Sequence, residues 1–219
     1  MGKGKQKLNL REHMHLLNEL QVDGEGEWPH VGRDTGWPVY DELVGSTKDR
    51  LYLFAGGAGC GKSSFVTQIF FNLLTNNEDM VGLFFSMDLA YLDLVARLYA
   101  ISSRLTLEQV RDPSIVSDED DLVRREEGLK VMESLQDRVV LVDQSHGIHS
   151  LDDVIEQMQN LRKDNPNSPM VVAIDPVSNL RTSEPGSRIE KVDYIVSELK
   201  SKARLLSTAI LLSSPLISG

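Results

Sequence analysis

The chain has 219 residues, 41% of them hydrophobic, which is enough to bury one sizeable core and favours a single domain with an appendage. Its net charge of −10 argues against broad, nonspecific attraction to nucleic acid but is compatible with a local basic channel. No apolar run approaches the ~20 residues that a membrane-spanning helix needs, so we expect no contact with a membrane. The single cysteine, Cys60, excludes an intramolecular disulfide framework and indicates a reducing, cytoplasmic compartment.

Residues 1–31 are expected to form a basic tail and a short helical arm. Lysines follow the first methionine, but no apolar segment comes after them, which argues against a secretory signal. Leucines then recur at helical spacing, at Leu8, Leu10, Leu16, Leu17 and Leu20. The polar run 23–27 is typical of a linker. The apolar stripe of the arm must be covered, either by the chain's own domain or by a neighbouring subunit.

From residue 50 onward, strand-like and helix-like segments alternate. Strands are predicted at 51–55, 81–86, 139–143, 170–175 and 209–213, and helices at 62–75, 91–103, 118–135, 151–163 and 188–207. This alternation predicts an α/β fold with a mostly parallel sheet flanked by helices. Ser117 with Asp120, and Ser150 with Asp153, have the spacing of a capping box, so both serines are expected to begin helices.

The segment 56–63, G-G-A-G-C-G-K-S, fits the phosphate-loop pattern G-x-x-x-x-G-K-[ST] between a predicted strand and a predicted helix. Glycines allow successive N–H groups to point at phosphate oxygens, and the helix N-terminus adds a positive field. The sequence therefore predicts a nucleoside triphosphate site. The residues expected to form it are Gly57, Ala58, Gly59, Cys60, Gly61, Lys62, Ser63 and Ser64.

Three predicted strands lead into carboxylates. The apolar run 170–174 ends in Asp175, as a Walker B segment does, and this carboxylate is expected to reach Mg²⁺ beside the Ser63 hydroxyl. The other two carboxylates are Asp88 and Asp143, and hydrolysis needs one such group to orient the attacking water. Periodicity does not choose between these two.

Several of these segments, in their order along the chain, resemble those of DnaB-type replicative helicases. Residues 84–89, F-F-S-M-D-L, resemble the F-F-S-L-E-M segment of that family, and residues 209–216 resemble its last core strand, V-I-A-L-S-Q-L. Further likenesses lie at T-G-W 35–37, D-E-L 41–43, L-V-D-Q 141–144 and A-I-D-P-V-S 173–178. The resemblance covers about residues 32–217 and implies a RecA-like ATPase core over 32–219. It also implies ATP and Mg²⁺ as cofactors, a homo-oligomer in the form of a hexameric ring, and single-stranded DNA as a partner.

The same resemblance assigns roles to individual residues. Lys62 and Asp88 are expected to be catalytic, with Asp88 in the place of the family's glutamate. Ser63 and Asp175 are expected to hold the metal, and Arg97 matches the arginine that follows the F-F-S-L-E-M segment and is expected to contact the nucleotide. Two arginines, Arg181 and Arg188, flank a loop where the helicases line their pore, so they are expected either to contact DNA or to belong to a solvated loop.

Three departures from the family pattern predict weak or absent ATP hydrolysis. Asp88 is one methylene shorter than glutamate, and Pro215 stands where a glutamine reads the γ-phosphate. The sequence given ends at Gly219, before the family's arginine finger, so the C-terminal part of the family domain is expected to be missing. We expect a truncated or degenerate DnaB-like helicase motor domain. The alternative is a RecA-like regulatory nucleotide switch, similar to the KaiC and RadA groups, without helicase activity.

Overall fold

The computed structural model describes residues 33–44, 47 and 49–216, all of which belong to the second of two compact units, Arg33–Gly219. The predicted basic tail and helical arm lie outside the described residues. Within those residues, no helix is both long enough and apolar enough to cross a membrane.

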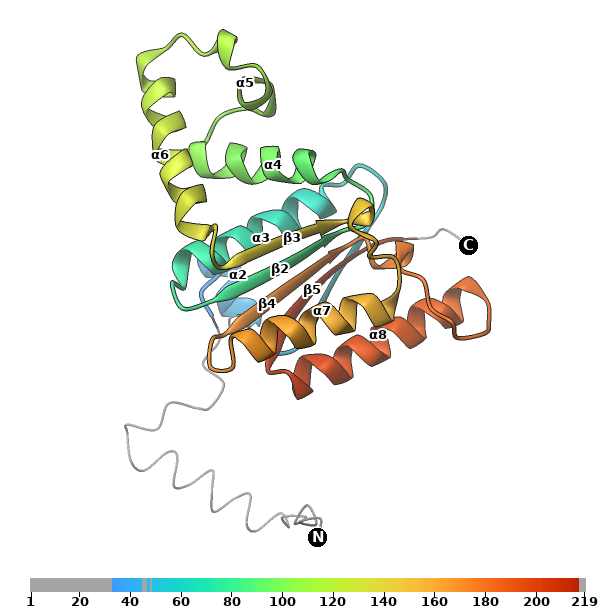
Figure 1. The fold of residues 1–219 in the computed structure, drawn as a ribbon. Helices are drawn as coiled ribbons and strands as arrows, with labels where there is room; N and C mark the ends of the chain where they lie inside the picture. The colour runs from blue at the N-terminus through green and yellow to red at the C-terminus, as the bar shows by residue number, and fades with distance from the viewer. Residues whose placement is uncertain (1–32, 45–46, 48, 217–219) are drawn as a thin grey trace, which may run out of the picture. The chain divides into compact units, whose positions relative to one another are not determined.

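A five-stranded parallel sheet forms the centre of the unit (Figure 1), with the strand order β1-β5-β4-β2-β3. The strands are β1 (Leu51–Gly56), β2 (Val81–Ser86), β3 (Val139–Asp143), β4 (Met170–Asp175) and β5 (Thr208–Pro215). In the register of the sheet, Ser86 at the end of β2 lies between Asp143 of β3 and Asp175 of β4. Because all strands are parallel, their carboxyl ends meet at one edge, and the predicted α/β fold is confirmed.

Helices cover both faces of the sheet (Figure 1). They are α2 (Pro38–Val44), α3 (Lys62–Asn76), α4 (Tyr91–Ser103), α5 (Leu107–Arg111), α6 (Glu119–Leu135), α7 (Leu151–Asp164) and α8 (Arg188–Leu205). Alternate residues of β4 enter two different cores, since Val172 packs with α7 and α8 whereas Val171 packs with α3 and α4. This two-sided burial explains why β2 and β4 are apolar throughout rather than alternating.

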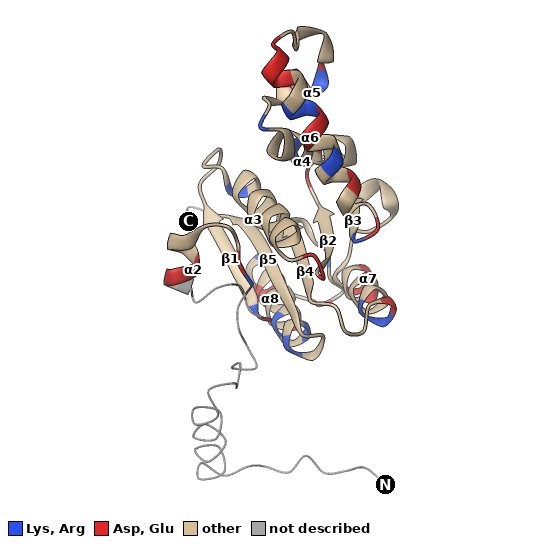
Figure 2. Cartoon of the chain, turned by 90° about the vertical axis from the view of Figure 1, so that its left-hand side faces the viewer, with Lys and Arg blue, Asp and Glu red and all other residues tan. Residues whose placement is uncertain are grey.

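Charged residues lie mainly on the outer helices (Figure 2). Within the five strands, only Asp143 and Asp175 are charged, and each is the last residue of its strand. A carboxylate at these positions avoids the apolar faces of the sheet and reaches the edge where ligands bind in parallel sheets. The fold thus gathers its internal negative charge at one edge.

Some predicted boundaries were wrong. Helix α6 begins after Asp118, not Ser117, because the Asp118 carboxylate accepts a hydrogen bond from the Asp120 N–H at 2.8 Å. The prediction that Ser150 caps a helix is confirmed by a complete capping box at the start of α7. Helix α8 ends at Leu205 because Ser207 takes a left-handed conformation, with φ of 45°. Helices α2 and α5 were not predicted, since seven and five residues are too few to show a helical period.

Candidate nucleotide-binding site

The loop between β1 and α3 has the conformation that its glycines favour. Gly59 and Gly61 have φ values of 73° and 89°, in the left-handed region that other residues rarely adopt. A Cβ atom built at Gly57, Gly59 or Gly61 would meet nothing within 4 Å, so these glycines border open space. At Gly56 a Cβ atom would lie 2.6 Å from the Sγ atom of Cys60, so that position accepts only glycine without rearrangement. The loop is therefore accessible in front of the α3 N-terminus, and we refer to it as the phosphate cradle.

The Lys62 side chain lies back over this loop. Its Nζ atom donates a hydrogen bond to the Gly57 carbonyl at 2.7 Å and lies 3.9 Å from the Sγ atom of Cys60. The ammonium group is thus held beside the same backbone that would surround a phosphate. Positive charge and backbone N–H groups at one place are what an anionic phosphate chain requires.

Ser63 and Asp175 meet at the edge of the sheet although 112 positions separate them in sequence. The Ser63 hydroxyl donates to Oδ1 of Asp175 at 3.1 Å, and the Ser213 hydroxyl donates to the same oxygen. Asp175 is only 3% exposed, so its carboxylate faces this contact rather than bulk water. The sequence predicted the first pair but missed Ser213, because an apolar run such as β5 does not reveal which strand lies beside it.

The oxygens of Ser63 and Asp175 fit the preference of Mg²⁺ for hard ligands. Among residues 33–44, 47 and 49–216, no group of three or more histidine, cysteine or acidic side chains could hold a metal by itself. Two protein oxygens beside a phosphate cradle match the usual magnesium arrangement, in which substrate phosphates and waters complete the shell. The residues present therefore fit a magnesium–nucleotide complex.

A cavity of about 190 Å³, lined by residues 86–90 and 143–145, lies at the ends of β2 and β3. It brings together the two carboxylates that the sequence offered for orienting water, Asp88 and Asp143. Asp88 is exposed and forms no hydrogen bond or ion pair with any other described residue. Its lone pairs are available to a ligand or a water molecule.

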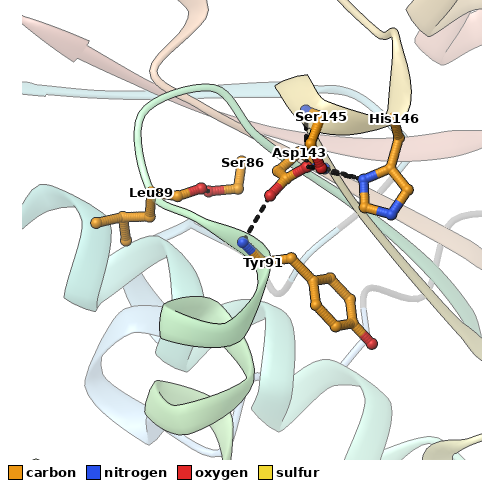
Figure 3. A network of polar contacts seen from close by, with 6 residues as sticks. All are labelled: Ser86, Leu89, Tyr91, Asp143, Ser145 and His146. Atoms are coloured by element: carbon orange, nitrogen blue, oxygen red, sulfur yellow. Dashed lines mark hydrogen bonds and ion pairs between the residues drawn. The ribbon is translucent and has the colours of Figure 1, made fainter.

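The Asp143 carboxylate, by contrast, is buried and engaged through both oxygens (Figure 3). One oxygen accepts from the Tyr91 backbone N–H at 2.7 Å. The other accepts from the backbone N–H and hydroxyl of Ser145 and lies 2.8 Å from Nδ1 of His146. The Ser145 hydroxyl, aided by these other hydrogen bonds, lowers the pKa of Asp143 to about 2. Asp143 therefore joins the end of β3 to the start of α4.

Arg97 and Ser64 line a second cavity, of about 240 Å³, between α3, α4 and α5. The structure thus brings these two predicted nucleotide-binding residues to one place. Its other lining residues are Thr67, Gln68, Ala100, Ile101 and Leu107. The Arg97 side chain forms no hydrogen bond or ion pair within the described part of the chain. The cavity is mostly apolar apart from this guanidinium and the polar side chains of α3.

Arg181 lies within the segment 176–187 that joins β4 to α8, and Arg188 lies at the end of that segment. The Arg181 backbone is fixed, since its N–H donates to the His149 carbonyl and its carbonyl accepts from the Leu151 N–H, both at 2.9 Å. Arg188 is the first residue of α8. Both residues are exposed, and neither forms an ion pair with another described residue.

Comparison with known proteins identifies the family. A family model described as the DnaB-like helicase C terminal domain matches residues 32–217. The chain belongs to this family. The resemblance inferred from its sequence segments is therefore confirmed. No curated protein matches the chain significantly.

Solved structures support the DnaB-like fold. A structure titled as a DnaB-like replicative helicase and its interactions with primase has a TM-score of 0.81 and 17% identity, and the match covers 98% of this chain and 50% of that one. A second structure, titled as an ATPase domain, also has a TM-score of 0.81 and 17% identity, with 97% of this chain and 72% of that one covered. At such identity the likeness shows the fold alone. The chain spans half the length of the first of these proteins.

Proposed function

We propose that this DnaB-like domain binds Mg-ATP and hydrolyses it as the motor of a DNA helicase, acting in a homo-oligomeric ring on single-stranded DNA. The observation that carries the proposal is the 3.1 Å hydrogen bond between Ser63 and Asp175. It joins the first turn of the phosphate-loop helix to the end of β4, where a Walker B carboxylate is needed. Family membership supports the ATPase class, and the exposed Arg181 and Arg188 support contact with DNA.

Each residue of the site has a distinct chemical task in this proposal. The loop N–H groups and Lys62 bind the phosphate oxygens and offset the negative charge that develops during transfer. Ser63 and Asp175 would hold Mg²⁺, which when bound neutralises charge on the phosphates. The free carboxylate of Asp88 orients the attacking water and accepts its proton. Arg97 contributes a positive charge from the neighbouring cavity.

The phosphate-binding role is tested by replacing Lys62 with alanine. We expect Lys62→Ala to remove measurable Mg-ATP binding in calorimetry, because the loop loses its full positive charge. Lys130→Ala is the matched control, since Lys130 is exposed on α6 and belongs to neither cavity of the site. Equal affinity of Lys62→Ala and the parent chain for Mg-ATP would contradict the proposal.

A nucleotide switch without motor activity is the second candidate. It is favoured by Pro215, which pairs with Gly56 in the sheet and so lies beside the phosphate loop without a polar side chain. The side chain of Asp88, which is shorter than the glutamate of the DnaB-type helicases, also favours a switch without motor activity. The two candidates differ in one measurable property, because DNA should stimulate ATP turnover by a helicase motor and should leave a protein-assembly switch unchanged.

A further inference from the structure

The loop 87–90, which carries Asp88, is held at its first residue by three neighbouring segments. The Met87 N–H donates to the Asp175 carbonyl at 2.8 Å. The Met87 carbonyl accepts from two side-chain amides, Nε2 of Gln144 at 2.8 Å and Nδ2 of Asn179 at 3.2 Å. Gln144 directly follows β3, and Asn179 closes a short turn after β4. Two strand ends therefore converge on one peptide group next to Asp88.

The far end of the same loop is also fixed. The Tyr91 N–H donates to the Asp143 carboxylate at 2.7 Å, and the Ser86 hydroxyl donates to the Leu89 carbonyl at 2.8 Å (Figure 3). Between these points the Asp88 side chain is exposed and has no partner among the described residues. A fixed backbone with a free carboxylate is the arrangement that aims a reactive group, because a misplacement of about 1 Å can cost about 100-fold in rate.

The two amides contribute little to the core. Gln144 and Asn179 are both exposed residues, and neither belongs to the two hydrophobic clusters that flank the sheet. Their contacts with the buried residue Met87 are nevertheless specific, since both donate to the same carbonyl oxygen. Removing them should release the loop without unfolding the domain.

We propose that Gln144 and Asn179 are positioning residues for ATP hydrolysis. Their amides hold the Met87 carbonyl and so aim the adjacent Asp88 carboxylate at the attacking water. This inference rests on the proposed function, in which Asp88 acts on that water. It adds two residues that neither touch the phosphate cradle nor belong to the predicted site.

The test uses Gln144→Met and Asn179→Leu, separately and together, because both changes remove the donor at similar volume. Mg-ATP affinity is measured by calorimetry, product formation is followed with enzyme in excess over ATP, and hydrogen exchange is followed at the amides of 87–90. We expect the double variant to keep its affinity within about twofold, to lose at least about 10-fold in hydrolysis rate, and to exchange faster in the loop.

Asn165→Leu is the control, since its amide donates to the Leu161 carbonyl at 3.1 Å, at the end of α7. The control should change none of the three measurements.

The outcomes separate failure of the positioning role from failure of the proposed function. Unchanged loop exchange or unchanged hydrolysis in the double variant would overturn the positioning role. A loss of Mg-ATP affinity equal to the loss of rate would also overturn it, because the amides would then act on binding. A parent chain that binds Mg-ATP but forms no product even with enzyme in excess would overturn the proposed hydrolysis, and the positioning role with it. A parent chain that does not bind Mg-ATP would instead overturn the proposed function itself.

Discussion

Asp88 and Asp143 line the same cavity at the edge of the sheet, yet only Asp143 is tied into the structure through both of its oxygens. A group that orients water must keep lone pairs free for it. The hydrogen bonds from Tyr91 and Ser145 occupy lone pairs of the Asp143 carboxylate, whereas the lone pairs of the Asp88 carboxylate accept no hydrogen bond from a described residue. The environments of the two carboxylates therefore favour Asp88 for the chemical step.

The first prediction separates these carboxylates by function. Asp88→Asn should bind Mg-ATP with nearly unchanged affinity and lose about 100-fold or more in hydrolysis rate, because a general base contributes mainly in the transition state. Calorimetry and single-turnover hydrolysis measure the two effects. If Asp143→Asn is instead the variant that binds ATP and fails to hydrolyse it, the roles assigned here are reversed.

The second prediction concerns acid stability. The pKa of Asp143 is lowered to about 2 in the folded protein, below its ordinary value of 3.8, so the unfolded chain binds its proton first as the pH falls. The resulting stabilisation is present above about pH 4 and is lost toward pH 2. We expect Asp143→Asn to cost on the order of 1–2 kcal/mol at pH 7 and progressively less below pH 4. Urea unfolding of the parent and the variant, compared across this range, measures the difference. A constant difference at every pH would contradict the assignment.

Residue types and spacing were sufficient to predict the loop between a strand and a helix at 56–63 and the approach of Ser63 to Asp175, and they offered two candidates for a water-orienting group. They were insufficient to predict that both carboxylate oxygens of Asp143 are engaged, because the second oxygen accepts from the Tyr91 N–H, which lies 52 positions away. The contacts of the Gln144 and Asn179 amides were not predictable for the same reason, because their acceptor, the Met87 carbonyl, follows a different strand. Partners close in space but distant in sequence leave no local signal.

At the scale of elements, the contact between α4 and α6 depends on a glycine in the middle of a helix. A Cβ atom at Gly128 of α6 would lie 2.6 Å from Cα of Ser103 in α4, which is backbone and cannot turn aside. We expect Gly128→Ala to destabilise the domain by about 1–3 kcal/mol through overpacking, although alanine favours a helix by up to about 1 kcal/mol. Glu127→Ala, at an exposed neighbouring position, is the control. Urea unfolding measures both variants, and a more stable Gly128→Ala would refute the close approach.

The strands and the long helices were predictable from their apolar patterns, whereas the short helices α2 and α5 were not. The strands 81–86, 139–143 and 170–175 match their predicted bounds, since each is a short apolar run that ends at a polar residue. The strand order β1-β5-β4-β2-β3 could not be obtained this way. Periodicity describes which faces of an element are buried, whereas strand order depends on which elements lie against those faces.

At the scale of the whole molecule, the residues proposed to bind ATP are all in place, while two positions proposed to serve hydrolysis depart from the pattern of the DnaB-type helicases. The loop 57–61 borders open space, and Ser63 meets Asp175 as a magnesium pair should. Asp88, however, is one methylene shorter than the glutamate of the DnaB-type helicases. Pro215 lies beside Gly56 and has no polar side chain. In the proposed hydrolysis these changes act on charge that develops late in the reaction, so we expect them to lower the rate more than the affinity.

The last prediction is that the 219-residue chain binds Mg-ATP but turns it over more slowly than about 1 s⁻¹, the lower end of the usual enzyme range. Asp88→Glu should raise the rate by about 10-fold, because restoring the methylene recovers part of a penalty that can reach about 100-fold per ångström. Steady-state ATPase assays on both chains, with and without single-stranded DNA, test this together with the choice between motor and switch. An ATPase rate that rises on adding DNA supports the motor, and an ATPase rate that DNA leaves unchanged supports the switch. A parent rate above about 1 s⁻¹, or an Asp88→Glu variant no faster than the parent, would show that the shorter carboxylate already reaches the water and that the loop 87–90 compensates for its length.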